Sequence, residues 1–247
     1  MNTLSNKIGT ESSTPNDEAR VESLWDRVPK SYQSEMYVRM PYCDFSLGTV
    51  AASFTTGYKQ WKMNSIYDPD LTGVGGQPLG RDTWAGIYNY YKVLESKITV
   101  EITELTHDIT GGTTSLVYPS LHGGMMDISA TPPTAINVWL NAALAGRSNE
   151  QQIFTPIISS NVIGSRDRGE VKYSMTWKPS MFDTAVIDSS TKDTWTPVGQ
   201  DPDDLNYFTQ IAYNPQGAGS RSYVYRTQIE YLVAFKQVNR NLLNTPN

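Results

Sequence analysis

Few side chains in this sequence are of a type that performs catalysis or binds a metal tightly. His107 and His122 are the only histidines, and Cys43 is the only cysteine. Zinc sites and catalytic triads need several such side chains close together, so we expect both histidines to be ordinary loop residues. No base is indicated near Cys43, and we expect it to be a small, buried or half-buried apolar residue. Histidine and cysteine chemistry is therefore disfavoured.

An acidic turn is the best candidate for a metal site. The segment from Asp68 to Gly73 opens like a calcium loop, with side-chain oxygens at positions one, three and five and glycine at position six. The twelfth position should carry a bidentate glutamate, but it is Leu79. The EF-hand is excluded, and Asp68 and Asp70 remain candidates for another structural divalent cation. No other cofactor is expected.

The remaining chemical motifs are incomplete. The glycine-rich segment 73–80 lacks the Gly-Lys-Ser/Thr ending of a phosphate-binding P-loop. The acidic turn 201–204 is typical of a solvated loop. No carboxylate pair can be placed across a cleft from the sequence. We expect no catalytic residues and no enzymatic activity, and a hydrolase on a β-sandwich is the least favoured hypothesis.

The elements that position these residues are predicted to be strands. Apolar and polar side chains alternate without interruption over residues 223–236, and shorter alternating runs cover 171–178 and 97–103. Weaker patterns predict further strands, of which the last is the least clear: 36–42, 58–66, 113–121, 207–213 and 183–188.

Two short helices interrupt the strand pattern. Asp82 is placed to cap a helix with Trp84, Tyr88 and Tyr91 on one face, and a second helix follows Pro133. Neither could form a layer, and no βαβ rhythm is present. The sequence therefore predicts an all-β fold: a single eight-stranded jelly-roll sandwich with two short helices inserted in loops. Residues 1–31 are predicted to be a flexible arm, and residues 32–247 the jelly-roll domain.

Composition narrows the class of protein. The 247 residues carry a formal net charge of -5 and include 15 tyrosines and 6 tryptophans. No apolar stretch approaches the ~20 residues of a membrane-spanning helix, and no signal-peptide pattern is visible, so we expect no membrane contact. Tyrosine and tryptophan often anchor interfaces. The aromatic residues predicted to make subunit contacts are Tyr67, Trp84, Tyr88, Tyr91, Trp139 and Trp195.

Four segments stand in an informative order. They are Asn-Ser-Ile-Tyr-Asp-Pro-Asp at 64–70, Gly-Gly-Gln-Pro-Leu-Gly-Arg-Asp at 75–82, Tyr-Asn-Tyr-Tyr-Lys-Val at 88–93 and Ser-Lys-Ile-Thr-Val at 96–100. This series resembles the capsid proteins of circular, Rep-encoding single-stranded DNA (CRESS-DNA) viruses, the circovirus-like group. The resemblance covers about forty residues.

The resemblance implies a jelly-roll coat protein. It implies self-assembly into an icosahedral T=1 shell of sixty copies, or a virus-like particle, around circular single-stranded DNA. The protein would belong to the virion, would be assembled in the nucleus or cytoplasm of the host cell, and would meet a host receptor that the sequence does not identify.

The N-terminal arm departs from this family. Related arms are rich in arginine, whereas residues 1–30 contain four basic and five acidic side chains. Phosphate binding requires clustered cations. Either a second protein condenses the genome, or the particle is empty, or cations of the folded body face the DNA, the candidates being Arg39, Lys59, Lys62, Lys236 and Arg240.

A binding module is the alternative hypothesis. A jelly-roll carbohydrate-binding domain would use surface tryptophan and tyrosine rings as platforms and could hold calcium at Asp68 and Asp70. Loss of glycan binding on substitution of Trp84 or Trp195 would favour it over a coat protein.

Overall fold

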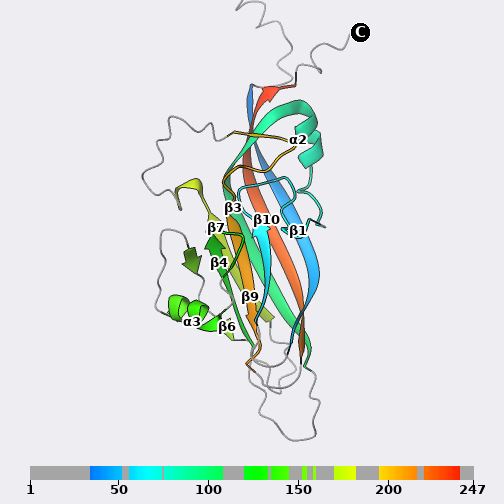
Figure 1. Cartoon of the computed structure of the whole chain (residues 1–247). Coiled ribbons are helices and arrows are strands. Elements are labelled where there is room, and N and C mark those ends of the chain that lie inside the picture. Colours follow the sequence, from blue (N-terminus) through cyan, green and yellow to red (C-terminus); the bar gives the residue numbers. More distant parts are fainter. Residues whose placement is uncertain are drawn as a thin grey trace, which may run out of the picture. The chain divides into compact units, whose positions relative to one another are not determined.

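Two antiparallel sheets face each other in the computed structural model and enclose the main core (Figure 1). The structure describes residues 34–51, 56–73, 75–107, 120–132, 135–144, 152–154, 158–159, 170–181, 195–215 and 220–239. The chain divides into the units Met1–Ser34 and Glu35–Asn247, and both sheets belong to the second. The predicted arm, 1–31, lies outside the described residues and stays a prediction.

Each sheet has four main strands and one short addition. The first sheet has the order β1-β10-β3-β7, with β8 paired to β3, and the second has the order β2-β9-β4-β5, with β6 paired to β4. The first consists of β1 (Glu35–Val50), β10 (Arg221–Val238), β3 (Tyr88–His107), β7 (Glu170–Trp177) and β8 (Thr196–Pro197). The second consists of β2 (Thr56–Lys62), β9 (Tyr207–Tyr213), β4 (Leu121–Asp127), β5 (Gln152–Phe154) and β6 (Ile158–Ser159).

The strand order is that of a jelly roll. Among the eight main strands, the first pairs with the last, the second with the seventh, the third with the sixth and the fourth with the fifth. This nesting arises when one long antiparallel hairpin is wrapped into two stacked sheets, which is the double Greek key of the jelly roll. The predicted fold class is therefore confirmed.

Two tyrosine hydroxyls form hydrogen bonds from one sheet to the other. The Tyr231 hydroxyl of β10 donates to the Lys62 carbonyl of β2 over 2.7 Å, and the Tyr173 hydroxyl of β7 donates to the Gly123 carbonyl of β4 over 2.9 Å. Burial raises the pKa of both phenols, so they remain protonated donors. A phenol can cross the roughly 10 Å between stacked sheets and still satisfy its hydroxyl. These two tyrosines therefore stabilise the interior of the sandwich.

Gly124 of β4 permits two buried rings to pack closely against the second sheet. A Cβ atom on Gly124 of β4 would lie 2.4 Å from Phe208 Cζ and 3.2 Å from Tyr173 Cε2, and both rings are buried. We expect Gly124→Ala to lower the free energy of unfolding by about 1–3 kcal/mol, because the rings cannot move aside without strain. Urea denaturation measures this. Gly76→Ala, where no atom lies within 4 Å, is the control, and equal losses in both variants would contradict the prediction.

The first helix differs from the prediction in its N-cap and in the residue at which it ends. The first is α2 (Arg81–Ile87), whose N-cap is Gly80 at φ 80°, and Asp82 lies inside the first turn without capping it. The helix ends before Tyr88, where β3 begins. The predicted helical face was wrong there because pairing of Tyr88 with Val238 in β10 overrides the local helical spacing. Two further helical segments are α3 (Ile136–Leu144) and the 3₁₀ turn η1 (Pro179–Met181).

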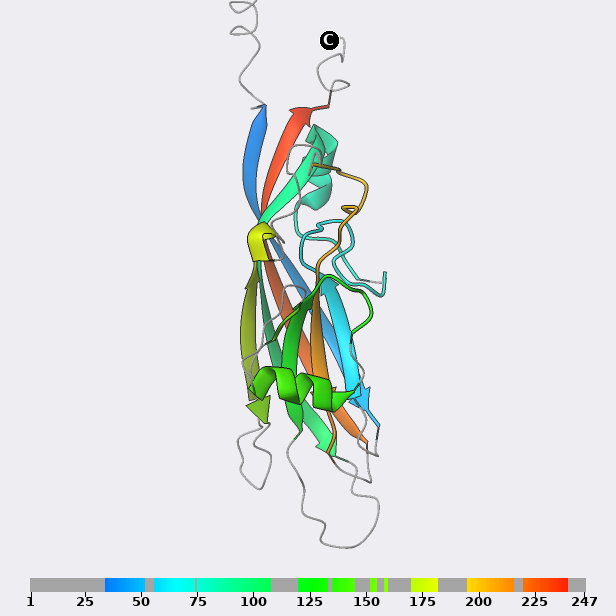
Figure 2. The same cartoon turned by 60° about the vertical axis from the view of Figure 1, so that its left-hand side comes forward.

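Helix α3 covers the outer face of the second sheet (Figure 2). Trp139 of α3 packs on Met125 of β4 and Ile211 of β9 in a small cluster separate from the main core. No described helix lies on the outer face of the first sheet in this way. No helix in the described part of the chain has the length and apolar character needed to cross a membrane.

Strand prediction succeeded where alternation was long. Strand β9 has the predicted bounds, and β10, β7 and β3 contain or nearly match the predicted runs. Strand β1 is much longer than residues 36–42, and β4 begins where the predicted strand 113–121 ends. The predicted strand 183–188 and residues 113–119 lie outside the described residues.

Candidate functional site

Residues 64–70, the first of the four segments that carry the family resemblance, are hydrogen-bonded to the loop before β9. The Asn64 side chain donates to the Asp204 carbonyl over 2.7 Å and accepts from the Asn206 amide over 2.8 Å. The Met63 amide also donates to the Asn206 carbonyl over 2.8 Å. A carboxamide can donate from its nitrogen and accept at its oxygen at the same time. Asn64 therefore has a structural role in joining two loops.

A buried polar cluster continues this junction. Asp201 accepts hydrogen bonds from Lys62 Nζ at 2.7 Å and from Ser65 Oγ at 2.6 Å. Ser65 Oγ also lies 3.1 Å from Tyr91 Oη, which donates to the Gln200 carbonyl over 3.0 Å. Burial raises the pKa of the Tyr91 phenol. The interpretation of 201–204 as a solvated loop was therefore wrong for Asp201.

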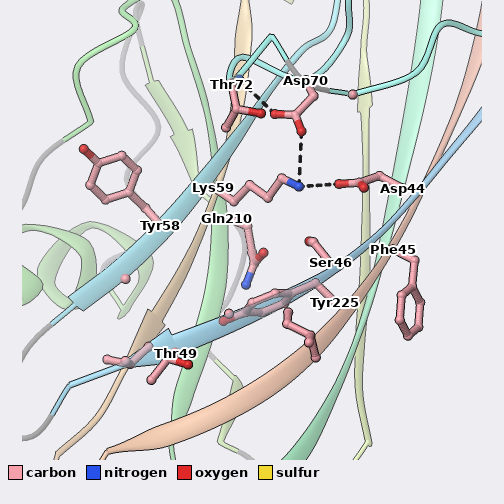
Figure 3. Close-up of a pocket in the computed structure, with 15 residues that line it drawn as sticks. Asp44, Phe45, Ser46, Thr49, Tyr58, Lys59, Asp70, Thr72, Gln210 and Tyr225 are labelled. Atoms are coloured by element: carbon pink, nitrogen blue, oxygen red, sulfur yellow. Dashed lines mark hydrogen bonds and ion pairs between the residues drawn. The ribbon is translucent and has the colours of Figure 1, made fainter.

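The predicted divalent-cation site is occupied by a lysine. Lys59 Nζ lies 3.3 Å from Asp70 Oδ2 and forms a second ion pair with Asp44, as Figure 3 shows. Asp70 Oδ1 accepts from the Thr72 amide over 3.0 Å. The described residues contain no cluster of three or more metal-binding side chains. Asp70 is corrected from a metal ligand to an ion-pair partner, and the same contacts leave Asp68 without a second acidic ligand for an ion.

Two predicted DNA-facing lysines are corrected by these contacts. The Lys59 side chain is 19% exposed and the Lys62 side chain 10% exposed, and each is held by aspartate. Lys236 and Arg39 are on the outer face of the first sheet, where Arg39 is 64% exposed and pairs with Glu230 at 3.0 Å. Arg240 lies outside the described residues.

Three of the six aromatic residues predicted at subunit contacts are interior. Tyr88, Tyr91 and Trp139 are each no more than 1% exposed. The Tyr88 ring contacts those of Trp84 and Phe235, with centroids 6.2 Å and 5.9 Å away, and these two rings also contact each other at 6.0 Å. These three are corrected to core residues, because a ring already enclosed by its own chain has no surface for a partner.

The other three aromatics keep some exposed surface. Tyr67 is 37% exposed and its ring lies 5.1 Å from the Arg81 guanidinium. Trp84 is half-buried against the core. Trp195 is half-buried, with Lys236 Nζ 4.4 Å from its ring centre. Their role in assembly stays a prediction.

Three of the exposed large apolar side chains lie on one strand, which composition did not point to. Tyr37, Phe45 and Leu47 of β1 are 59%, 70% and 73% exposed. They project from the outer face of an edge strand, since β1 pairs only with β10 within its sheet. Cys43 projects from the same face and is exposed, so the expectation that it is buried was wrong. We define Tyr37, Cys43, Phe45 and Leu47 as the β1 stripe.

A sequence signal for this stripe was present. In β1 the inward positions from Met36 to Tyr42 are apolar, as a core strand requires, and most outward positions of the strand are apolar too. Strands with two apolar faces are usually covered on both sides. The described part of this chain covers only one.

A groove separates the edge strands β1 and β2. It has a volume of about 510 Å³ and is lined from both strands, with Tyr58 exposed at its rim (Figure 3). Within the described residues, Ser46 Oγ and Gln210 Oε1 are buried there without a hydrogen-bond partner. The groove therefore offers buried polar atoms and the aromatic side chains of Phe45, Tyr58 and Tyr225.

His122 is not the loop residue that the sequence predicted. His122 lies in β4 with 1% exposure, not in a loop, and contacts the Tyr223 ring edge-on at 5.0 Å. Burial, together with the charge of Arg221, lowers the pKa of His122 to about 4. His107 ends β3, and its side chain is outside the described part. A neutral, buried imidazole with no access to solvent has no substrate to act on.

Comparison with solved structures found similarity to virus structures. The decameric BFDV capsid protein matches at 12% identity and TM-score 0.37 over 82% of this chain and 99% of that chain. Cocksfoot mottle virus matches at 13% identity and TM-score 0.40 over 85% of this chain and 100% of that chain. The 60-mer BFDV capsid protein matches at 11% identity and TM-score 0.35 over 87% and 100%. Because every TM-score here is below 0.5, the jelly-roll assignment rests on the strand order itself.

No protein-family model matches the sequence, and no curated protein matches it.

Proposed function

We propose that this chain is a viral coat protein that self-assembles through the β1 stripe into a small icosahedral shell. The shell would contain sixty copies around a circular single-stranded DNA genome, as the resemblance of residues 64–100 implies. The protein would be a structural component of the virion, without enzymatic activity, assembled in the nucleus or cytoplasm of a host whose receptor is unknown.

The observation that carries this proposal is the β1 stripe. A long edge strand with exposed apolar side chains is a site for association, and soluble monomers protect such edges with charge, proline or a covering element. Arg39 and Pro41 lie in the first half of β1, whereas the half that carries Phe45 and Leu47 has no outward charge, proline or covering element in the described structure. In a shell built from one protein, the partner that covers this stripe would be a second copy of the same chain.

The polar junction of residues 64–70 supports the same proposal. Asn64, Ser65 and Asp70 each hold loops or strands of the same chain together. The residues that carry the family resemblance therefore shape the loops of the subunit, and none is placed for chemistry on a small substrate.

Assembly is tested with the double variant Phe45→Ser/Leu47→Ser. We expect the wild-type protein to form particles by size-exclusion chromatography with light scattering and by electron microscopy, and the variant to stay mostly unassembled, with at least tenfold fewer particles. Leu79→Ser/Val138→Ser removes exposed apolar side chains elsewhere and should assemble normally. Wild-type protein that stays monomeric across salt and pH, or a double variant that assembles fully, would overturn the proposal.

Cys43 supplies an independent measurement. It is the chain's only cysteine and lies within the β1 stripe. We expect a maleimide dye to label the unassembled subunit rapidly and the particle at least tenfold more slowly, because assembly covers the thiol. Equal labelling rates in both states would place the interface elsewhere on the subunit.

The groove between β1 and β2 favours a second candidate, a carbohydrate-binding module. Tyr58 could stack on a sugar ring while Gln210 and Ser46 bind its hydroxyls. Glycan-array binding that is lost in Tyr58→Ala and kept in Tyr37→Ala, a tyrosine of similar exposure, would support this function. Calcium is not needed there, because Lys59 already neutralises Asp70.

A further inference from the structure

Exposed positive charge is segregated onto one face of the molecule. In the described part of the chain, seven lysines and arginines project from the outer face of the first sheet. Four of them have side chains that are exposed by 57% or more: Arg39, Lys172, Lys178 and Arg226. Lys97 is also exposed, and Lys92 and Lys236 are partly buried. The strand register places these side chains on one surface, which we call the basic face.

Elsewhere in the described structure, cations are not available to a partner. Lys59, Lys62 and Arg81 have side chains that are no more than 19% exposed and lie in ion pairs, and Arg221 is 1% exposed. Off the basic face, the carboxylate side chains that the structure describes belong to eight aspartates, including Asp201, Asp203 and Asp204. The chain as a whole is acidic, with a charge of -5, yet its accessible cations share one surface.

The basic face carries an excess of positive charge. Among the side chains that the structure describes, which do not include those of Glu104 and Glu170, seven cations face four glutamates, Glu35, Glu95, Glu101 and Glu230, a net of +3. Glu101 lies between Lys172 at 2.6 Å and Arg226 at 3.4 Å, so one carboxylate faces two cations. The hydrogen bond from Lys172 lowers the pKa of Glu101.

Aromatic rings lie among these cations. Lys236 Nζ is 4.4 Å from the Trp195 ring centre and 6.0 Å from that of Tyr90, and both rings are partly exposed. Cations that follow a phosphate backbone and rings on which bases stack are the two components of a surface that binds single strands.

We propose that the basic face binds a single-stranded nucleic acid, with phosphates on the lysines and arginines of β3, β7 and β10 and a base on Trp195 or Tyr90. Charge complementarity between a polyanion and the part of this face formed by β3, β7 and β10 selects that occupant, since the described surface off this face is acidic. The β1 stripe lies along the edge of the same face, with Phe45 opposite Arg226, and is left to the subunit contact. The inference rests on the proposed function, and it places the packaged strand against the folded body without requiring a basic arm. Of the DNA-facing candidates named from the sequence, Arg39 and Lys236 belong to this face.

Binding of a fluorescent 30-nucleotide oligo-dT to the full chain tests the proposal. In Lys97→Gln/Lys172→Gln we expect binding about tenfold weaker at low salt, and a slope of log affinity against log salt smaller by about 1.4, because two phosphate contacts are lost. Gln77→Glu/Thr83→Glu changes the net charge equally at exposed positions off the face and should bind within twofold of wild type. Equal weakening in both variants, or none in the first, would overturn the proposal.

The stacking contribution is tested separately. Trp195→Ala should weaken oligo-dT binding at least fivefold and leave binding of an abasic strand of the same length unchanged. Equal loss on both strands would show attraction by charge alone and would contradict base stacking at this ring.

Failure of this proposal can be distinguished from failure of the proposed function. Particles that form normally from a chain that binds no oligo-dT would overturn the basic face and leave the coat protein intact. Oligo-dT binding that depends on Lys97 and Lys172 in a chain that never assembles would support the basic face and overturn the coat protein.

Discussion

Lowering the pH from 6.5 to about 4 is expected to reduce the free energy of unfolding by roughly 3 kcal/mol through His122 alone. The imidazole is buried, its pKa is lowered to about 4, and within the described residues neither ring nitrogen has a hydrogen-bond partner. In this pH range the unfolded chain binds a proton at His122 that the folded chain does not bind. The unfolded state therefore gains stability as the pH falls, and the loss is complete once the pH is below about 4.

Urea denaturation at several pH values measures this dependence. In His122→Leu we expect most of the slope between pH 4.5 and 6.5 to disappear, because the titrating group is gone. Below pH 4.5 a separate loss remains, since Glu101 has its pKa lowered by Lys172 and must be protonated there. An unchanged slope between pH 4.5 and 6.5 in His122→Leu would contradict the assignment to His122.

Asp201→Asn is expected to lower the free energy of unfolding by about 2–3 kcal/mol. The substitution keeps the shape of the side chain but removes the charge that faces Lys62, whose side chain is only 10% exposed. The ammonium group would then lie nearly buried beside an amide that offers it one acceptor. Asp201 is itself 30% exposed, so water reduces the cost below that of a fully buried pair.

A double-mutant cycle separates this pair from general disruption of the loop. Lys62→Met removes the stranded charge, and in Lys62→Met/Asp201→Asn we expect at least half of the loss caused by Asp201→Asn to be recovered. If the losses of unfolding free energy in the two single variants add up to the loss in the double variant, Asp201 stabilises the protein through Ser65 and the loop alone.

Local alternation predicted the strands well because it does not depend on a partner. Side chains of any strand point alternately to two faces, so residues 207–213 and 223–236 could be identified without knowing what covers them. The junction at Tyr88 could not, because its spacing also fits a helix and only the pairing with β10 decides between the two.

The chemistry of single residues was predictable only in part. His122 appeared to lie in a turn because Gly123 and Gly124 follow it, yet Gly124 lets the Phe208 and Tyr173 rings approach β4 inside the core. Cys43 appeared to be a small core residue, and its outward position follows from the register between β1 and β10.

The sequence by itself determined the class of fold, the absence of a histidine- or cysteine-rich centre and the family that residues 64–100 resemble, since these depend on periodicity, composition and order along the chain. Only the tertiary structure decided which lysines are neutralised, which tyrosines are interior and where the exposed cations gather. Lys62 meets Asp201 across 139 positions of sequence, and the basic face is assembled from four strands. Such contacts arise from strand register across the sandwich, and no local pattern encodes them.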